Sequence, residues 1–165
     1  MMARRNYLIM LIASLLLLGA CRPAEYQKIP IESLDSKLKS RGSIIVRDIL
    51  KSINHKDGAR YLLDKDYMTP LVHGRIMHNT QIYREAYGYI PMTIGKISSF
   101  SLFQVLDKGL IKTMRYQLKT DAENLEFVEL KIDVNIELGL ADYYLYITSK
   151  DGLLKRENIL PAVAK

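Results

Sequence analysis

The stretch that decides the fold runs from Glu126 to Leu138 and reads EFVELKIDVNIEL. Its apolar positions alternate with polar ones and are Val128, Leu130, Ile132, Val134, Ile136 and Leu138. Successive side chains of a β-strand point to opposite faces, so this alternation predicts one long strand with its apolar face on a core. The opposite face carries Glu129, Asp133 and Glu137, and we expect it to lie in water.

Shorter alternating segments flank this strand on both sides. We expect strands at 97–106, 110–119, 143–149 and 154–159. Within the first of them, one face is expected to carry Phe100, Leu102 and Leu106, and the other Phe103 and Val105. The intervening sequences are typical of tight turns and read Asp107-Lys108-Gly109, Gly139 to Asp142, and Lys150-Asp151-Gly152. The second half of the chain is therefore predicted to be an antiparallel meander.

The preceding part of the chain has the periodicity of helices. Apolar residues recur at three- to four-residue steps, and we expect helices at 33–53, 59–63 and 71–87. Gly42 is the weak point of the first helix, and Asp57 is expected to cap the second. Pro70 marks the start of the third, and Gly88 is expected to end it.

Composition and element order together predict the fold class. The chain has 165 residues, of which 48% are hydrophobic and 25% charged, which is typical of one globular domain and not of a disordered or collagen-like chain. Helices followed by a run of strands favour an α+β domain, with N-terminal helices packed on a curved antiparallel β-meander.

The turns around the expected sheet resemble those of a known superfamily. They are Tyr87-Gly88, Ile94-Gly95-Lys96-Ile97-Ser98-Ser99 and Thr148-Ser149-Lys150-Asp151-Gly152. Together with the order of helices and strands, they look like the NTF2-like (cystatin-like) superfamily, in particular its small bacterial lipoproteins. The resemblance covers about residues 33–160 and implies a cone-shaped domain.

The beginning of the chain has the layout of a bacterial secretion signal. Arg4 and Arg5 precede the uncharged run Tyr7 to Leu18. At ~1.5 Å per residue, this run is too short to cross the ~30 Å apolar core of a bilayer. It ends in Leu18-Gly19-Ala20-Cys21, which resembles the lipobox of bacterial lipoproteins and contains the sole cysteine. The alternative is an ordinary secretory signal followed by a buried cysteine.

The lipobox resemblance implies cleavage between Ala20 and Cys21 and the attachment of fatty acyl chains to Cys21, which hold a protein on a membrane. Arg22 stands where the inner-membrane retention signal has Asp, so the resemblance favours the periplasmic face of the outer membrane. We therefore divide the chain into a signal peptide at 1–20, the lipidated Cys with a flexible tether at 21–32, and a single domain at 33–165.

The charge pattern favours a membrane surface over nucleic acid as a partner. Removal of residues 1–20 leaves 22 basic against 18 acidic residues, a net charge of +4, and the two signs are interspersed. The histidines His55, His73 and His78 lack the spacing of a metal-binding pair. We expect no metal and no cofactor.

Signatures of catalysis are weak. Enzymes of the resembled superfamily, such as ketosteroid isomerase and its dehydratase relatives, place an Asp or an Asp–His pair inside the cone. The best acid–base candidates here are Asp64, Asp66 and His73, although Asp64-Lys65-Asp66 is also typical of a solvated helix end. We assign no catalytic residue and expect a protein that is not an enzyme. A periplasmic isomerase or dehydratase that uses a pocket carboxylate is the alternative.

Tyrosine is in excess, with 11 Tyr against three Phe and no Trp. Tyrosine clusters can line a ligand site or a protein interface, and ordinary core packing is the competing interpretation. The candidates for such a surface are Tyr83, Tyr87, Tyr89, Tyr144 and Tyr146. Adjacent Tyr143 and Tyr144 are expected on opposite faces of their strand. The leading hypothesis is a binding or accessory module for an envelope protein partner or a small apolar ligand, and a structural subunit of an envelope complex is a further alternative.

Overall fold

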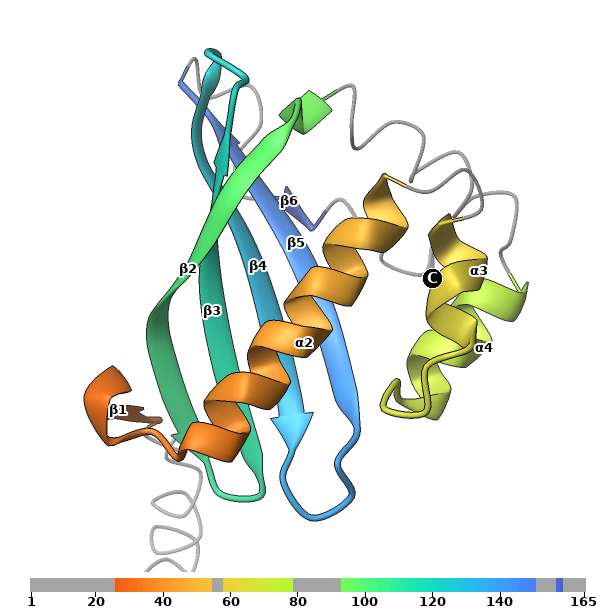
Figure 1. Ribbon diagram of the computed structural model, residues 1–165, viewed down its shortest axis with the longest axis vertical. Coiled ribbons are helices and arrows are strands. Elements are labelled where there is room, and N and C mark those ends of the chain that lie inside the picture. The colour runs from red at the N-terminus through yellow and green to blue at the C-terminus, as the bar shows by residue number, and fades with distance from the viewer. Residues whose placement is uncertain (1–25, 55–57, 79–92, 151–156, 159–165) are drawn as a thin grey trace, which may run out of the picture.

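The structure is a computed structural model that describes residues 26–54, 58–78, 93–150 and 157–158 (Figure 1). It contains a six-stranded antiparallel sheet in the order β1-β2-β3-β4-β5-β6. The strands are β1 (Gln27–Ile29), β2 (Ile97–Lys108), β3 (Ile111–Thr120), β4 (Leu125–Asn135), β5 (Ala141–Ser149) and β6 (Glu157–Asn158). The helices are the 3₁₀ helix η1 (Ile31–Ser33), α2 (Ser36–Ile53), α3 (Gly58–Leu63) and α4 (Pro70–His78). The predicted α+β class is confirmed.

Strand β4 confirms the central part of the sequence pattern. Val128, Leu130, Ile132 and Val134 are buried on the core face. The strand ends at Asn135, whose side-chain oxygen accepts hydrogen bonds from the backbone N–H groups of Glu137 and Leu138 at 3.1 and 3.0 Å. The prediction that Ile136 and Leu138 continue the core face was wrong, because both lie in this turn and are exposed.

Helix α2 lies across the concave face of the sheet (Figure 1). It begins at Ser36, after Asp35, whose carboxylate caps the helix by accepting a hydrogen bond from the backbone N–H of Lys37 at 3.2 Å. Its buried apolar stripe consists of Ile45, Val46, Ile49 and Ile53, which share one core with residues of β3, β4 and β5. In the part of the chain that the structure describes, this stripe of α2 therefore packs on the concave face of the sheet.

Gly42 lies inside α2 and marks the closest approach of the helix to the sheet. A Cβ atom at this position would lie 2.6 Å from Cε of Met114 on β3 and would also overlap the hydroxyl of Tyr116. Both partners are core residues. The glycine therefore does not break the predicted helix but allows it to pack closely on β3.

We expect Gly42→Ala to lower the free energy of unfolding by about 1–3 kcal/mol, because the added methyl group overpacks the helix–sheet contact. The matched control is Gly74→Ala in α4, where nothing lies within 4 Å of an added Cβ. There we expect a gain of up to about 1 kcal/mol, the ordinary preference of helices for alanine. Urea denaturation measures both variants, and equal stabilisation of the two would contradict the packing role of Gly42.

A β-bulge in β2 changes which residues face the core. The register with β3 shifts across Phe103, which is the extra residue. Val105 then takes the core-facing place and is fully buried. The prediction that Leu106 shares the face of Phe100 and Leu102 was wrong, because the bulge moves Leu106 to the outer face of the sheet, away from α2.

The first described residues belong to the sheet. Gln27 lies opposite Asp107 in β2, so β1 forms one edge of the sheet. We expected residues 21–32 to form a flexible tether, and the structure instead places 27–33 in β1 and η1.

Helices α3 and α4 lie beside α2 (Figure 1). The loop between them is fixed to β5, because the backbone N–H of Ala141 donates to the carbonyl of Tyr67 at 2.6 Å and that of Thr69 donates to the carbonyl of Ala141 at 3.0 Å. Helix α4 begins at Pro70, as predicted. The predicted continuation at 79–87, the Asp57 cap and the leader lie outside the described residues.

Candidate functional site

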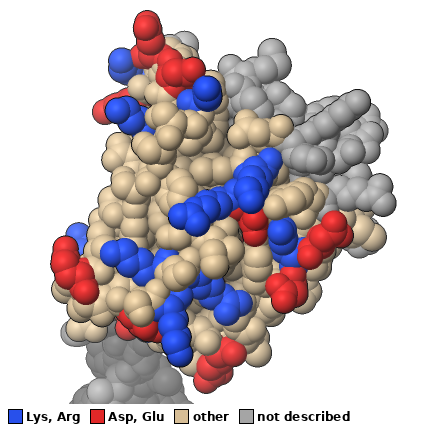
Figure 2. All heavy atoms as spheres, viewed as in Figure 1, with Lys and Arg blue, Asp and Glu red and all other residues tan. Residues whose placement is uncertain are grey.

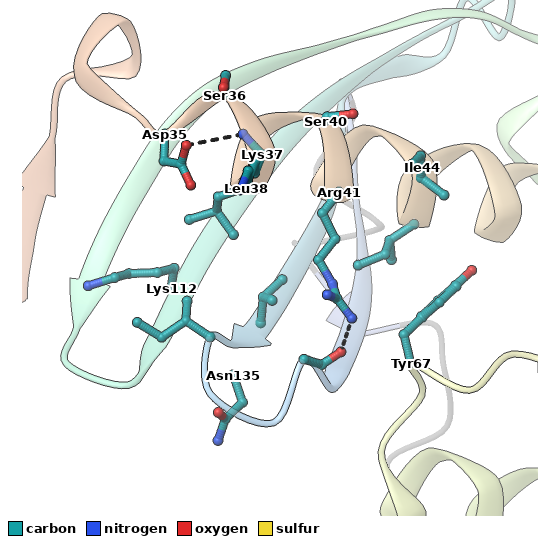
Figure 3. Close-up of a pocket in the computed structure, with 14 residues that line it drawn as sticks. Asp35, Ser36, Lys37, Leu38, Ser40, Arg41, Ile44, Tyr67, Lys112 and Asn135 are labelled. Atoms are coloured by element: carbon teal, nitrogen blue, oxygen red, sulfur yellow. Dashed lines mark hydrogen bonds between the residues drawn. The ribbon is translucent and has the colours of Figure 1, made fainter.

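A groove of about 920 Å³ opens between the first half of α2 and the turn that follows β4 (Figure 3). Its apolar lining consists of Leu38, Ile44, Ile45, Val134 and Ile136. Its polar and charged lining includes Lys37, Arg41, Tyr67, Lys112 and Asn135. Hollows of this size, with mainly apolar walls and a few polar groups, are typical of sites for small ligands.

Arg41 connects the two sides of the groove. Its Nη2 donates a hydrogen bond to the carbonyl oxygen of Gly139 in the β4–β5 turn (Figure 3). Gly139 has a positive φ of 65°, and an added Cβ would lie 2.7 Å from Nη2 of Arg41. The turn depends on a glycine here, and a contact within the chain holds the groove in shape.

The exposed side of α2 is strongly cationic. Lys37, Lys39, Arg41, Arg47 and Lys51 are all exposed. Figure 2 shows Lys and Arg gathered over the face on which this helix lies. Of the nearby acids, Asp35 lines the groove and caps α2, Asp48 is buried, and Glu137 in the β4–β5 turn is exposed. The surface beside the groove therefore attracts anions.

Asp48 is a buried carboxylate on α2. The hydroxyls of Tyr67 and Tyr61 donate hydrogen bonds to its two oxygens at 2.7 and 3.1 Å, and Nζ of Lys65 lies 3.5 Å away. Burial acts to raise the pKa of Asp48, but these hydroxyls and Lys65 outweigh it, so the pKa lies below its ordinary value. Burial and the neighbouring carboxylate raise the pKa of Tyr67. A carboxylate whose two oxygens are both hydrogen-bonded suits a structural link between α2 and the segment around α3.

We expect Asp48→Asn to lower the free energy of unfolding at neutral pH by about 1–3 kcal/mol, because the two hydroxyls and Lys65 lose a charged acceptor. A carboxylate with a lowered folded-state pKa stabilises the fold above its unfolded pKa and loses this contribution as the pH falls through the folded pKa. The gap between wild type and variant should therefore narrow below about pH 4.

Denaturant titrations at neutral and acidic pH measure this gap. Asp64→Asn is the matched control, because Asp64 is an exposed acid just after α3, and we expect it to change the stability by less than about 0.5 kcal/mol. A loss in Asp48→Asn that is independent of pH would contradict the role of the carboxylate charge.

The outer face of the sheet buries a second acid. Glu129 was predicted to lie in water, and this was wrong, since it is 2% exposed. Arg115 donates hydrogen bonds from Nε and Nη2 to its two oxygens at 2.5 and 2.7 Å, and these bonds raise the pKa of Arg115. The ring centre of Phe103, the bulge residue, lies 5.0 Å from Cζ of Arg115. Asp133 is half-buried and ion-paired, and Glu137 is exposed as expected.

The predicted tyrosine surface is described only in part. Tyr144 and Tyr146 stack on the outer face with ring centres 6.5 Å apart, and Nζ of Lys131 lies 4.5 Å from the ring centre of Tyr144. Tyr143 is buried, so its expected orientation opposite to Tyr144 is confirmed. Tyr146 also lines a hollow of about 310 Å³ on this face. The remaining candidates, Tyr83, Tyr87 and Tyr89, lie outside the described residues.

The acid–base candidates do not meet in the groove. Asp64 and Asp66 are exposed, His73 is half-buried in α4, and none of the three lines the groove. Within the described ranges, no group of three or more His, Cys, Asp and Glu side chains is arranged to hold a metal ion. His55, Ala20 and Cys21 lie outside these ranges.

The residues that form the groove and the buried acid were not among the sequence candidates. Arg41 and Lys112 belong to no motif in the sequence, and they line the same groove only because α2 packs on the sheet. Asp48 did carry a signal, because it follows Ile45 by three positions and precedes Ser52 by four, on the buried stripe of α2.

Comparison of the chain with protein-family models, curated proteins and solved structures found no match. None of the described helices combines the length and the apolar composition needed to cross a bilayer. The groove, the cationic side of α2 and the leader sequence are the observations that bear on function.

Proposed function

We propose that the protein is a membrane-anchored envelope lipoprotein that binds an anionic amphiphile, a small apolar ligand with a negatively charged head, in the groove beside α2. The observation that carries the binding role is the combination of apolar walls with the cations Lys37 and Arg41 in one groove. A third cation of the lining, Lys112, is paired with Asp107. The apolar walls remove hydrocarbon surface of the ligand from water, and this burial stabilises the complex by about 25 cal/mol per Å². The cations attract the anionic head.

The anchor and the location are proposed from the leader. Leu18-Gly19-Ala20-Cys21 supports cleavage before Cys21 and acylation of its thiol, and Arg22 favours the periplasmic face of the outer membrane. The long helix across a curved meander supports an NTF2-like (cystatin-like) domain with α2 packed on its concave face. Asp48 accepts hydrogen bonds from two tyrosines and does not line the groove, so an isomerase or dehydratase role has less support than binding.

We expect Cys21→Ser to abolish acylation and to release the chain from the membrane fraction, because each buried CH₂ of an acyl chain contributes about 0.8 kcal/mol to anchoring. Intact-mass spectrometry of the wild-type chain from membranes should give the mass of a chain beginning at Cys21 plus its acyl groups. Ala24→Ser, just beyond the proposed lipobox, is the control and should behave like wild type. An intact, unmodified leader on the wild-type chain would overturn the lipoprotein assignment.

A photoreactive long-chain fatty acid should label the groove of the lipidated chain in isolated membranes. We expect Ile44→Asp to reduce this labelling about ten-fold, which corresponds to about 1.4 kcal/mol, because an apolar contact is replaced by a charge that repels the ligand carboxylate. Mass spectrometry of the cross-linked peptides gives both the yield and the labelled residues.

Met77→Asp is the matched control for this variant. Met77 is also an exposed apolar residue on a helix, but it does not line the groove. A photoreactive alcohol of the same chain length tests the cations, and we expect it to label less than the acid. Unchanged labelling in Ile44→Asp would overturn the ligand site, and stable co-purification of one envelope protein, lost in Ile44→Asp, would favour a protein partner instead.

A further inference from the structure

Large exposed apolar side chains gather at one end of the sheet. Leu110 and Ile111 lie at the β2–β3 turn, and Ile136 and Leu138 lie in the β4–β5 turn. The exposed fraction reaches 69% for Leu138 and 51% for Leu110. Ordinary turns of soluble domains are polar, so a cluster of this kind points to contact with an apolar medium.

The two turns form one surface, which we call the hairpin-tip patch (Leu110, Ile111, Ile136 and Leu138). Ile111 is paired with Asn135 at the ends of β3 and β4. The backbone N–H of Ile136 donates a hydrogen bond to the carbonyl of Leu110 at 2.9 Å. The patch therefore has a fixed shape, because the backbone of one turn is bonded to that of the other.

Cations flank the hairpin-tip patch. Lys108 ends β2 directly opposite Ile111, and its Nζ lies 3.8 Å from Oδ1 of Asp133. Arg41 is bonded to Gly139, next to Leu138. Lys112 lies between the patch and the groove and is paired with Asp107. Glu137 is an exposed acid within the same turn. Apolar tips with basic residues around them match a bilayer surface that contains anionic phospholipid.

The start of the described chain lies at the same end. Gln27 pairs with Asp107, and the ring centre of Tyr26 lies 4.8 Å from Nζ of Lys108. Tyr26 is five residues after Cys21, a reach of at most about 18 Å for an extended chain. The opposite end of the sheet, at residues 121–124, lies about 33 Å from the end that carries the patch, because β3 has 10 residues at ~3.3 Å each.

We propose that the hairpin-tip patch docks on the surface of the anionic phospholipid bilayer that holds the Cys21 anchor. This inference rests on the proposed lipid anchor, which delivers the chain to the bilayer from the end that carries the patch. Docking orients the strands steeply to the membrane and brings the groove, which shares Ile136 and Lys112 with this end of the molecule, to the lipid surface.

The test uses the lipidated full chain reconstituted in phosphatidylcholine vesicles that contain phosphatidylglycerol. Leu138→Cys provides a single reactive thiol, because Cys21 is acylated, and it is labelled with an environment-sensitive dye. Asn124→Cys is the matched control, an exposed turn residue at the opposite end of the sheet. We expect nitroxide-labelled phospholipids to quench the dye at 138 several-fold more than the dye at 124, and Leu110→Asp to reduce the quenching at 138.

Three other results of this experiment would overturn the proposal, and they distinguish a failure of docking from a failure of the anchor. A chain that floats with the vesicles but shows equal quenching at both positions overturns docking and leaves the anchor intact. A dye at 138 that is shielded from water but not quenched by lipid overturns docking in favour of a second copy of the chain on the patch. A chain that carries no acyl groups and does not float overturns the anchor and the docking together.

Discussion

The contact between α2 and the concave face of the sheet is the constraint on which the rest of the structure depends. It joins the apolar stripe of α2 to the alternating apolar face of β4, two patterns of different period that only a helix–sheet layer brings together. Gly42 sets the distance, because Met114 and Tyr116 occupy the space that a side chain would need. Once α2 lies there, its first turns and the end of β4 leave a groove between them, and its five basic residues face outward.

Features that depend on periodicity could be predicted from the sequence, and features that depend on a single local bond could not. The alternation of apolar residues through Val134 predicted β4, and the three- to four-residue spacing of apolar residues predicted α2. The end of β4 depends on hydrogen bonds to one asparagine side chain, and the face exchange in β2 depends on one inserted residue, Phe103. Neither the end of β4 nor the bulge in β2 changes the alternation of its segment, so neither could be predicted from it. The exposure of Ile136 and Leu138 was missed for the same reason.

The environments of the charged residues were harder to predict, because they depend on partners that are distant in sequence. Asp48 is held by side chains 13 and 19 positions later, and Glu129 by one 14 positions earlier. Alternation correctly assigned Glu129 to the outer face of the sheet, but its carboxylate is buried there because Arg115 and the large side chains of neighbouring strands cover it. A face can be predicted from a strand pattern, whereas its hydration depends on neighbouring strands.

The arrangement of the two ends of the sheet links the proposed anchor to the proposed ligand site. An antiparallel meander places alternate turns at opposite ends, so the β2–β3 and β4–β5 turns share one end. The pairing of β1 with the last residues of β2 brings the first described residues to the same end. The groove opens at this end because the β4–β5 turn forms one of its walls. An amphiphile that leaves a bilayer pays the cost of exposing its hydrocarbon to water unless it enters a site at the lipid surface. An anchor close to the groove would remove that exposure, so the proposed lipid attachment would serve the proposed binding directly, in addition to retaining the domain at the membrane.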